Sequence, residues 1–282
     1  MKNIKISFCI IVCNGDDFIY ECLESIYPHA HSICISEGAT ENWMNVHGWE
    51  NPRSKDATIE LIKKFKQELD VDNKLQCVIK PNPYKNKLDQ CNTYIDIIPP
   101  DTDYLWVIDS DELYLDDDVN NMKNILLENN YDYVEVFMDH FFKNINTIAI
   151  GGDGWGWNTP IGRIWKYSSG AQWQSHRPMT LITKDGQNIN KMNILHANQH
   201  NIRCKHYSYM TDKQVKEKMM YYTKTFNIDY INGWYKHVWL KWNINPSYVE
   251  SKYSTHPSCG GGKTKSYNGI HPNVILKKFG IV

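Results

Sequence analysis

Short apolar runs alternate with amphipathic segments through the first part of the chain. Residues 6–13, ISFCIIVC, form a continuous apolar and β-branched run that is typical of a strand buried on both faces of a parallel sheet. Residues 16–27 change to helical spacing, with two aspartates at the start. A second apolar run follows at 32–36. The pattern predicts a β-strand, an α-helix and a second β-strand packed as one unit.

The same alternation continues further along the chain. Residues 37–57 are polar and predict a long loop, which a helix at 56–69 and a strand at 75–80 follow. A helix at 87–97 and a strand at 103–109 come next. Strands that alternate with helices predict an open, mostly parallel α/β sheet, in which ligands bind beyond the carboxyl ends of the strands.

The second half of the chain has a different pattern. From residue 133 it predicts strands and loops rich in glycine and tryptophan, and then a capped helix at 211–226. Residues 256–269, HPSCGGGKTKSYNG, lack the spacing of a phosphate-binding loop and predict a flexible surface segment or lid. We therefore predict one α/β domain over residues 1–226, with a helical or irregular C-terminal extension, 227–282, packed on the same domain.

Charge and composition limit the classes of partner. Lys and Arg total 31 and Asp and Glu total 32, so this balance gives no support for a nucleic-acid partner. The eight cysteines form no C-x-x-C pair, and a chain of 282 residues can bury a core without disulfides, so we expect reduced thiols and a cytoplasmic protein. No stretch approaches the ~20 apolar residues of a membrane helix, so we expect no transmembrane segment, while a peripheral membrane contact stays open.

An acidic cluster follows the strand that ends at residue 109. Its members are Asp109, Ser110, Asp111 and Glu112. Carboxylates this close repel each other unless a cation lies between them. Mg²⁺ or Mn²⁺, which keeps several waters and binds phosphate oxygens, is the natural partner, and a nucleotide would supply the phosphates. The alternative is that Asp109 caps the following turn and the other acids are solvated.

The acidic cluster is one of several segments, in the same order, that resemble the GT-A glycosyltransferases, in particular the family 2-like group that uses nucleotide-sugar donors. The matching segments are IIVCNGDDFIYECLESI, ICISEGATEN, RSKDAT, NKLDQCN, DSD and CKHYSYM. The resemblance covers roughly residues 4–225, and the ordered series is more specific than any one segment. It implies a GT-A, Rossmann-like fold with a mostly parallel central sheet flanked by helices.

The resemblance also implies residues that contact the nucleotide-sugar donor. These are Cys13, Glu37, Asp56, Lys87, Ser110 and Asp111. Cys13 stands where the family usually has Tyr, and Glu37 stands where it usually has Asp, which keeps the charge and changes the reach. Lys87 would meet a phosphate as a point charge. The alternatives are a solvated loop carboxylate for Glu37 and an exposed helical lysine for Lys87.

The metal site implied by the resemblance consists of Asp109, Asp111 and His206. Imidazole suits Mn²⁺ better than Mg²⁺, so the histidine favours manganese, although both ions are candidate cofactors. The alternative for His206 is a purely structural histidine, since eleven histidines are available.

The glycine-rich residues 152–178 carry four tryptophans and the candidates for acceptor chemistry. Trp155 and Trp157, between glycines, predict a mobile donor or acceptor lid, whereas Trp165 and Trp173, at strand-like positions, predict core side chains.

A general base must take the acceptor proton in an inverting transferase. Arg163 and His176 match the family, but Arg177 stands where many relatives have Glu. Our candidates for catalytic residues are therefore Asp153 and His176, and the competing residues are Asp139 and His140.

These observations predict a metal-dependent glycosyltransferase. It would move a sugar from a nucleotide-sugar, with a UDP-sugar favoured, to a hydroxyl of a glycan, glycolipid or glycoprotein. The resemblance favours inversion, and retention stays open. One alternative is a sugar-phosphate nucleotidyltransferase, which would need a basic, Gly-rich first loop, whereas CNGDDF has one glycine and no Lys or Arg. The other is a non-catalytic carbohydrate-binding protein on a decayed transferase fold. The sugar, base and acceptor stay open because a few pocket contacts determine them.

Overall fold

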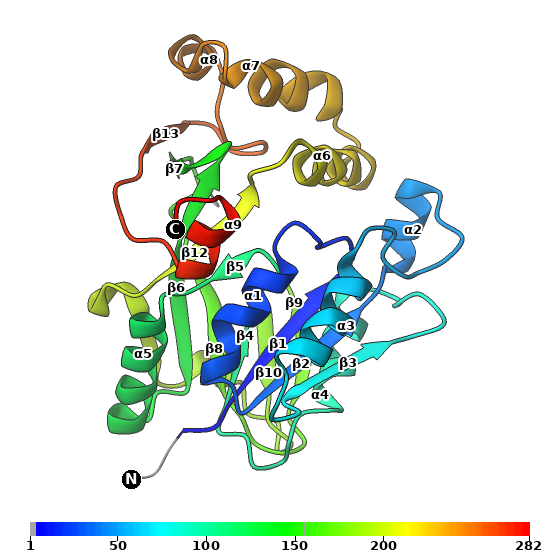
Figure 1. The fold of residues 1–282 in the computed structure, drawn as a ribbon, viewed down its shortest axis with the longest axis vertical. Coiled ribbons are helices and arrows are strands. Elements are labelled where there is room, and N and C mark those ends of the chain that lie inside the picture. The colour runs from blue at the N-terminus through cyan, green and yellow to red at the C-terminus, as the bar shows by residue number, and fades with distance from the viewer. Residues whose placement is uncertain (1–3, 155) are drawn as a thin grey trace.

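The structure is a computed structural model that describes residues 4–154 and 156–282. One half of its central sheet consists of the parallel strands β1 (Ile6–Val12), β2 (Ser32–Glu37), β3 (Leu75–Ile79) and β4 (Tyr104–Val107) (Figure 1). They lie in the order β3-β2-β1-β4, and each pairs in parallel with its neighbour. β2 is buried along its whole length, as its apolar sequence predicted.

A mixed half completes the sheet. Its strands are β5 (Glu112–Leu113), β6 (Tyr133–Phe142), β7 (Asn144–Gly151), β8 (Ile161–Lys166), β11 (Ile194–His196), β12 (Arg203–Tyr209) and β13 (Gly262–Ser266). β8 joins the two halves because it pairs antiparallel with both β4 and β6. The described residues thus form an 11-stranded sheet, beside a separate hairpin of β9 (Gln172–His176) and β10 (Met179–Ile182).

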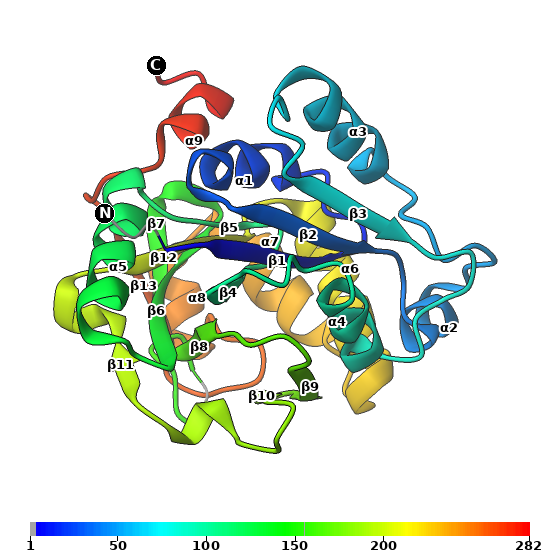
Figure 2. The same cartoon turned by 90° about the horizontal axis from the view of Figure 1, so that it is seen from below.

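Helices cover both faces of the parallel half (Figure 2). α1 (Ile19–Ile26) and α3 (Thr58–Glu68) lie on one face, and α4 (Lys87–Ile95) lies on the other. The remaining α-helices are α2 (Glu41–His47), α5 (Asp116–Asn129), α6 (Asp212–Phe226), α7 (Leu240–Trp242), α8 (Pro246–Lys252) and α9 (Asn273–Lys278). The other helical segments are the 3₁₀ turns η1 (Tyr27–His29), η2 (Ile189–Lys191) and η3 (Ala197–His200) and the π-helix η4 (Ile231–Trp239).

The predicted α/β fold is confirmed. The elements predicted before residue 110 occur as expected, the largest difference being a helix start at 16 instead of at Ile19. The long loop predicted at 37–57 is wrong in part because α2 forms within it. Thr40 caps this helix by accepting a hydrogen bond from the Trp43 amide at 3.3 Å, and Gly48 ends it in a left-handed conformation.

The C-terminal residues are more regular than predicted. The prediction of a flexible segment or lid at 256–269 is wrong for the residues of β13. This strand pairs antiparallel with β7, whose edge would otherwise leave backbone groups unpaired. α9 packs on α1, with Ile275 in the same apolar cluster as Phe18 and Lys278 Nζ 2.9 Å from Glu21 Oε1. Residues after 226 therefore supply both a strand and a helix to the main body, and the division of the chain at that point stays a prediction.

The structure also bears on the membrane and the thiols. Among residues 4–154 and 156–282, no helix has the length and apolar character needed to cross a bilayer.

All eight cysteines are free. Burial raises the pKa of Cys34 to about 11, so this thiol stays protonated at neutral pH.

Candidate active site

The acidic cluster forms a tight turn between β4 and β5. The Glu112 amide donates to the Asp109 carbonyl oxygen at 3.0 Å, and the Asp109 amide donates to Glu112 Oε2 at 3.2 Å. The loop after β1 lies directly against this turn, since a Cβ on Gly15 would come within 2.7 Å of Ser110 Oγ. Gly15 is therefore needed for the close approach. The turn lies at the carboxyl end of the central strands, where α/β sheets bind ligands.

Arg163 on β8 compensates part of the negative charge. Its buried guanidinium forms an ion pair with buried Glu112, and its Nη2 atom lies 3.4 Å from Asp109 Oδ2. Burial alone would raise the pKa of Asp109, but the charges of Arg163 and Lys87 hold it well below its usual range. Burial raises the pKa of Glu112 to about 7 in spite of Arg163. The sequence matched Arg163 to the family but did not predict its pairing with Glu112.

β12 brings His206 to the other carboxylate of the turn. His206 Nε2 lies 3.5 Å from Asp111 Oδ1. The second ring nitrogen, Nδ1, lies 2.9 Å from Nδ1 of His140, the residue in register with it on β6. Burial and then the charge of His206 hold the pKa of His140 well below its usual range, so His140 is neutral. The hydrogen bond fixes the His206 ring and leaves Nε2 as the nitrogen that faces Asp111.

These residues fit a divalent cation bound by Asp111 and His206. Two ligands about 2.1 Å from a cation and at right angles lie about 3.0 Å apart, close to the observed separation. The Asp109 side chain is 49% exposed, and Arg163 faces only one of its oxygens. Within the described residues, no group of three or more His, Cys, Asp or Glu is placed to hold a metal ion. The protein would then supply two direct ligands, and water and phosphate oxygens would supply the others.

His176 and Lys87 come from β9 and α4, two elements that are attached to each other. Two hydrogen bonds attach β9 to α4, from Asn92 Nδ2 to the Trp173 carbonyl at 3.0 Å and from the Trp173 amide to Asn92 Oδ1 at 2.9 Å. His176 ends this strand, and exposed Lys87 begins the helix. Burial and the charge of Lys87 lower the pKa of His176 to about 4, so its imidazole is neutral at pH 7. The charge of Lys87 also acts on Asp109.

Glu37 ends β2 with an unusual combination of burial and charge. Its side chain is fully buried, and its Oε1 atom accepts a hydrogen bond from the Ser54 amide at 2.9 Å. Its Oε2 atom has no partner among the described residues. Burial raises the pKa of Glu37, and burial followed by the charge of Glu37 raises that of neighbouring Cys13. This oxygen is shielded from solvent, so a donor hydroxyl would reach it only after a local rearrangement, and a contact with the nucleotide stays a prediction.

Asp56 is occupied by contacts within the protein. It accepts hydrogen bonds from the Thr58 amide at 3.0 Å, from the Asp16 amide at 3.3 Å and from Lys213 Nζ at 3.0 Å. Although burial would raise the pKa of Asp56, the bonds from Thr58 and Lys213 lower it. Asp56 thereby ties the start of α3 to α6, and a contact with the nucleotide stays a prediction.

Asp153 lies apart from the acidic turn. It is exposed, and its amide donates to the Gly260 carbonyl oxygen at 3.0 Å. No hydrogen bond or ion pair among the described residues joins it to Asp109 or Asp111. The structure therefore brings together the predicted residues of the turn, Lys87, His176 and His206, and it does not join Asp153 to them.

The structure tests the predictions for three of the four tryptophans of residues 152–178. Trp165 and Trp173 are buried and in edge-to-face contact at 4.9 Å, which confirms them as core residues. The predicted lid role is wrong for Trp157, which is only 5% exposed and packs on His140 at 4.8 Å between ring centroids. Trp155 lies outside the described residues.

Comparisons with known proteins give only distant likenesses. No protein-family model matches the chain, and no curated protein matches it. One similar solved structure is S. aureus TarS 1–349 in complex with UDP-GlcNAc, with 14% identity and a TM-score of 0.38 over 49% of this chain and 35% of that chain. Another is S. aureus TarS 1–349, with 12% identity and a TM-score of 0.45 over 88% of this chain and 83% of that chain.

A different enzyme is also similar. The 4-diphosphocytidyl-2C-methyl-D-erythritol synthase from Anaerococcus prevotii DSM 20548 has 10% identity and a TM-score of 0.32 over 58% of this chain and 70% of that chain. The first TarS alignment spans about a third of that protein's length. At these similarities the neighbours do not decide the function, which has to be argued from the site.

Proposed function

We propose that this chain is a metal-dependent glycosyltransferase that moves a sugar from a nucleotide-sugar to an acceptor hydroxyl. The observation that supports this most directly is the pair of Asp111 and His206, held 3.5 Å apart at the carboxyl end of the central sheet. Half-exposed Asp109 is part of the same turn, and the charge of exposed Lys87 acts on it, so the site offers both a cation-binding edge and a positive charge for phosphate.

Each residue near the diphosphate has a separate task in this proposal. Asp111 and His206 would hold Mn²⁺ or Mg²⁺ as direct ligands, and the exposed oxygen of Asp109 would add negative charge beside the ion. When bound, the ion would supply positive charge to the departing diphosphate. Lys87 binds a phosphate oxygen, and Arg163 keeps the acidic turn in place through Glu112. Glu37, as the resemblance implies, accepts a hydrogen bond from a ribose hydroxyl or from the base once its buried Oε2 atom is uncovered.

We assign the acceptor proton to His176 for a reaction that proceeds with inversion. The acceptor oxygen forms a bond to the anomeric carbon, the bond from that carbon to the phosphate oxygen breaks, and its electron pair leaves with the nucleoside diphosphate. The His176 imidazole takes the hydroxyl proton. Asp153, which lies against Gly260, is the second candidate for this step.

The choice of donor and of acceptor class follows from the family that the sequence resembles. A UDP-sugar is the donor that we propose first. A glycan, glycolipid or glycoprotein acceptor and a cytoplasmic location stay predictions.

Calorimetric titration with UDP, GDP, CDP and dTDP, each with Mn²⁺, with Mg²⁺ and with chelator, tests the proposal. We expect one nucleotide, UDP first, to bind in a metal-dependent manner. Binding of all four nucleotides that is unchanged by chelator would contradict a metal site in this turn, and the absence of any binding would contradict the donor site.

A further inference from the structure

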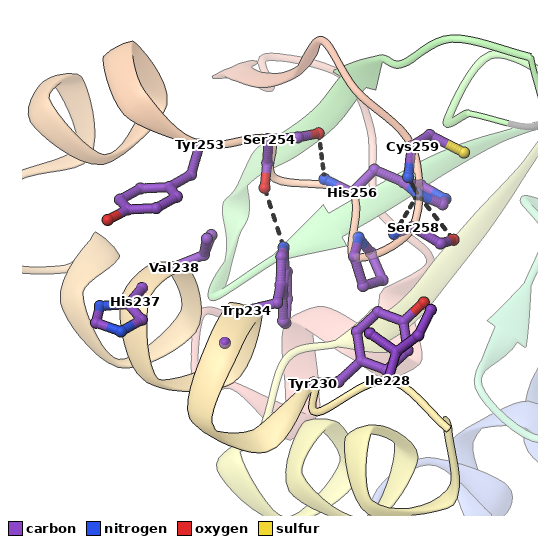
Figure 3. A pocket seen from close by; sticks show the side chains of 12 residues that line it. Ile228, Tyr230, Trp234, His237, Val238, Tyr253, Ser254, His256, Ser258 and Cys259 are labelled. Carbon is purple, nitrogen blue, oxygen red and sulfur yellow. Dashed lines mark hydrogen bonds between the residues drawn. The ribbon is translucent and has the colours of Figure 1, made fainter. Parts of the chain in front are cut away.

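A pocket of about 480 Å³ opens between η4 and the loop that precedes β13. Figure 3 shows Tyr253 and His237 on one side of it, Tyr230 on the other, and Trp234 between them. Its volume falls within the range of small-molecule sites, about 300–1,000 Å³. η4 is a π-helix, in which the Tyr235 amide donates to the Tyr230 carbonyl oxygen at 2.8 Å. Such segments are rare and occur often at functional sites.

The lining of this pocket is aromatic and uncharged. No Lys, Arg, Asp or Glu is among the described residues that line it. The Tyr253 side chain is 43% exposed, and its ring stacks on His237 with centroids 6.0 Å apart. Trp234 Nε1 donates to the Ser254 carbonyl oxygen at 3.0 Å, which fixes the indole ring. Ring faces without charges suit an uncharged ligand with apolar faces.

Neutral polar groups at the rim complete the lining. His256 Nδ1 accepts hydrogen bonds from the amides of Ser258 at 3.2 Å and Cys259 at 3.0 Å, so its Nε2 atom carries the proton and is a donor. Burial lowers the pKa of His256 to about 4, which keeps the ring neutral. Ser254 Oγ accepts from the amides of His256 at 3.1 Å and Gly262 at 2.9 Å, and its hydroxyl proton is free to donate. Hydroxyl groups of a sugar would match these donors.

The pocket shares lining residues with a second space on the side of His176. A smaller space of about 110 Å³ shares Tyr230 and His256 with it and is also lined by Arg177, the residue after His176. Ring contacts lead back to the metal-binding edge: His256 to Trp157 at 4.6 Å, Trp157 to His140 at 4.8 Å, and His140 to His206 at 4.9 Å. A molecule that filled both spaces would reach Arg177, the residue after His176.

We propose that this aromatic pocket binds an uncharged sugar unit of the acceptor and directs the acceptor hydroxyl toward His176. The assignment of this sugar to the acceptor rests on the proposed function, whereas the binding of a sugar in the pocket does not. In this arrangement the ring of Tyr253 covers one face of the sugar, and His256 Nε2 and Ser254 Oγ donate hydrogen bonds to its hydroxyls.

Saturation-transfer NMR on the full chain without nucleotide tests the proposal. The probes are methyl β-D-glucopyranoside, methyl 2-acetamido-2-deoxy-β-D-glucopyranoside and cellobiose, with methyl β-D-glucuronide as the charged comparison. We expect at least one uncharged probe to bind, and Tyr253→Ala to weaken it roughly tenfold, as expected for the loss of one aromatic contact. Tyr248→Ala is the matched control, because Tyr248 is an exposed tyrosine of α8 that does not line the pocket.

The same samples are titrated with UDP and Mn²⁺, which separates the two proposals. Uncharged sugar binding that depends on Tyr253 supports the pocket, whether or not UDP binds, and a failure of UDP alone counts against the proposed function. If no uncharged probe binds, whether or not UDP does, or if Tyr248→Ala has the same effect as Tyr253→Ala, the pocket proposal is overturned.

Discussion

The two sides of the proposed active site differ in their chemistry. On the side of the parallel sheet, a turn with three carboxylates is surrounded by Arg163, Lys87 and His206. On the C-terminal side, the aromatic pocket presents rings and neutral donors without a charged side chain among its described residues. A diphosphate with its cation needs the first environment and a neutral sugar the second. Removal of one partner from the buried ion pair on the charged side should therefore cause a large loss of stability. Removal of one ring from the aromatic pocket should cause a smaller loss of sugar affinity.

The largest expected effect comes from breaking the buried ion pair. Arg163→Met leaves Glu112 buried without its partner and should lower the free energy of unfolding by about 3–5 kcal/mol in urea denaturation. Arg53→Met, at an exposed arginine, is the control and should change little. The double variant Arg163→Met with Glu112→Leu should recover most of the loss. An equal loss in the double variant would show that the charge of Glu112 is not the cause.

Removal of the proposed imidazole ligand should have the next largest effect. His206→Ala should weaken Mn²⁺ binding in the presence of UDP by about 100-fold, because one of two direct protein ligands is lost. Manganese electron paramagnetic resonance measures the bound ion directly. His200→Ala removes an exposed histidine and should leave the affinity unchanged. Equal affinity in the His206 and His200 variants would exclude His206 as a ligand.

A smaller effect is expected at the residue that orients this ligand. His140→Phe keeps a ring against Trp157 but removes the 2.9 Å contact with His206, so we expect Mn²⁺ affinity to fall about tenfold. Thermal unfolding without metal should stay close to wild type. A loss of stability without any change in metal affinity would make His140 a packing residue only.

The smallest effect is a pH dependence on the uncharged side. The folded protein keeps His256 neutral down to about pH 4, while the unfolded chain takes up a proton near the ordinary value of 6.5. Stability from this residue is therefore present above pH 6.5 and is lost as pH falls toward 4. His256→Asn retains an acceptor for the Ser258 amide and cannot titrate, so its stability should fall less over this interval. The same slope in both proteins would contradict the assignment.

The sequence predicted the charged side better than the aromatic side. Local signals marked the acidic turn, since an apolar strand ends where Asp109 begins. The helix α2 was missed although Thr40 and Gly48 are typical caps, because its residues are polar and its stability depends on the stacking of Trp43 on Tyr221 of α6 at 5.3 Å. That contact joins segments far apart in the chain, which periodicity does not record.

Long-range pairing explains the other omissions. From the sequence, Glu112 is expected to be a solvated acid. In the fold, β8 places Arg163 beside Glu112, and both side chains are buried. His140 and His206 become neighbours through the parallel register of β6 and β12. The aromatic pocket had no sequence signal beyond its composition, because its shape depends on η4 and on the placement of the loop before β13.

UDP affinity with Mn²⁺ and with chelator, measured for wild type, Asp111→Asn and Asp117→Asn, tests the central claim most directly. Asp117 is an exposed acid at the start of α5, so its variant makes the same change of charge outside the site. We predict that Mn²⁺ strengthens UDP binding in wild type and in Asp117→Asn and has no effect in Asp111→Asn. An undiminished effect of Mn²⁺ in Asp111→Asn would contradict a donor cation held by the acidic turn.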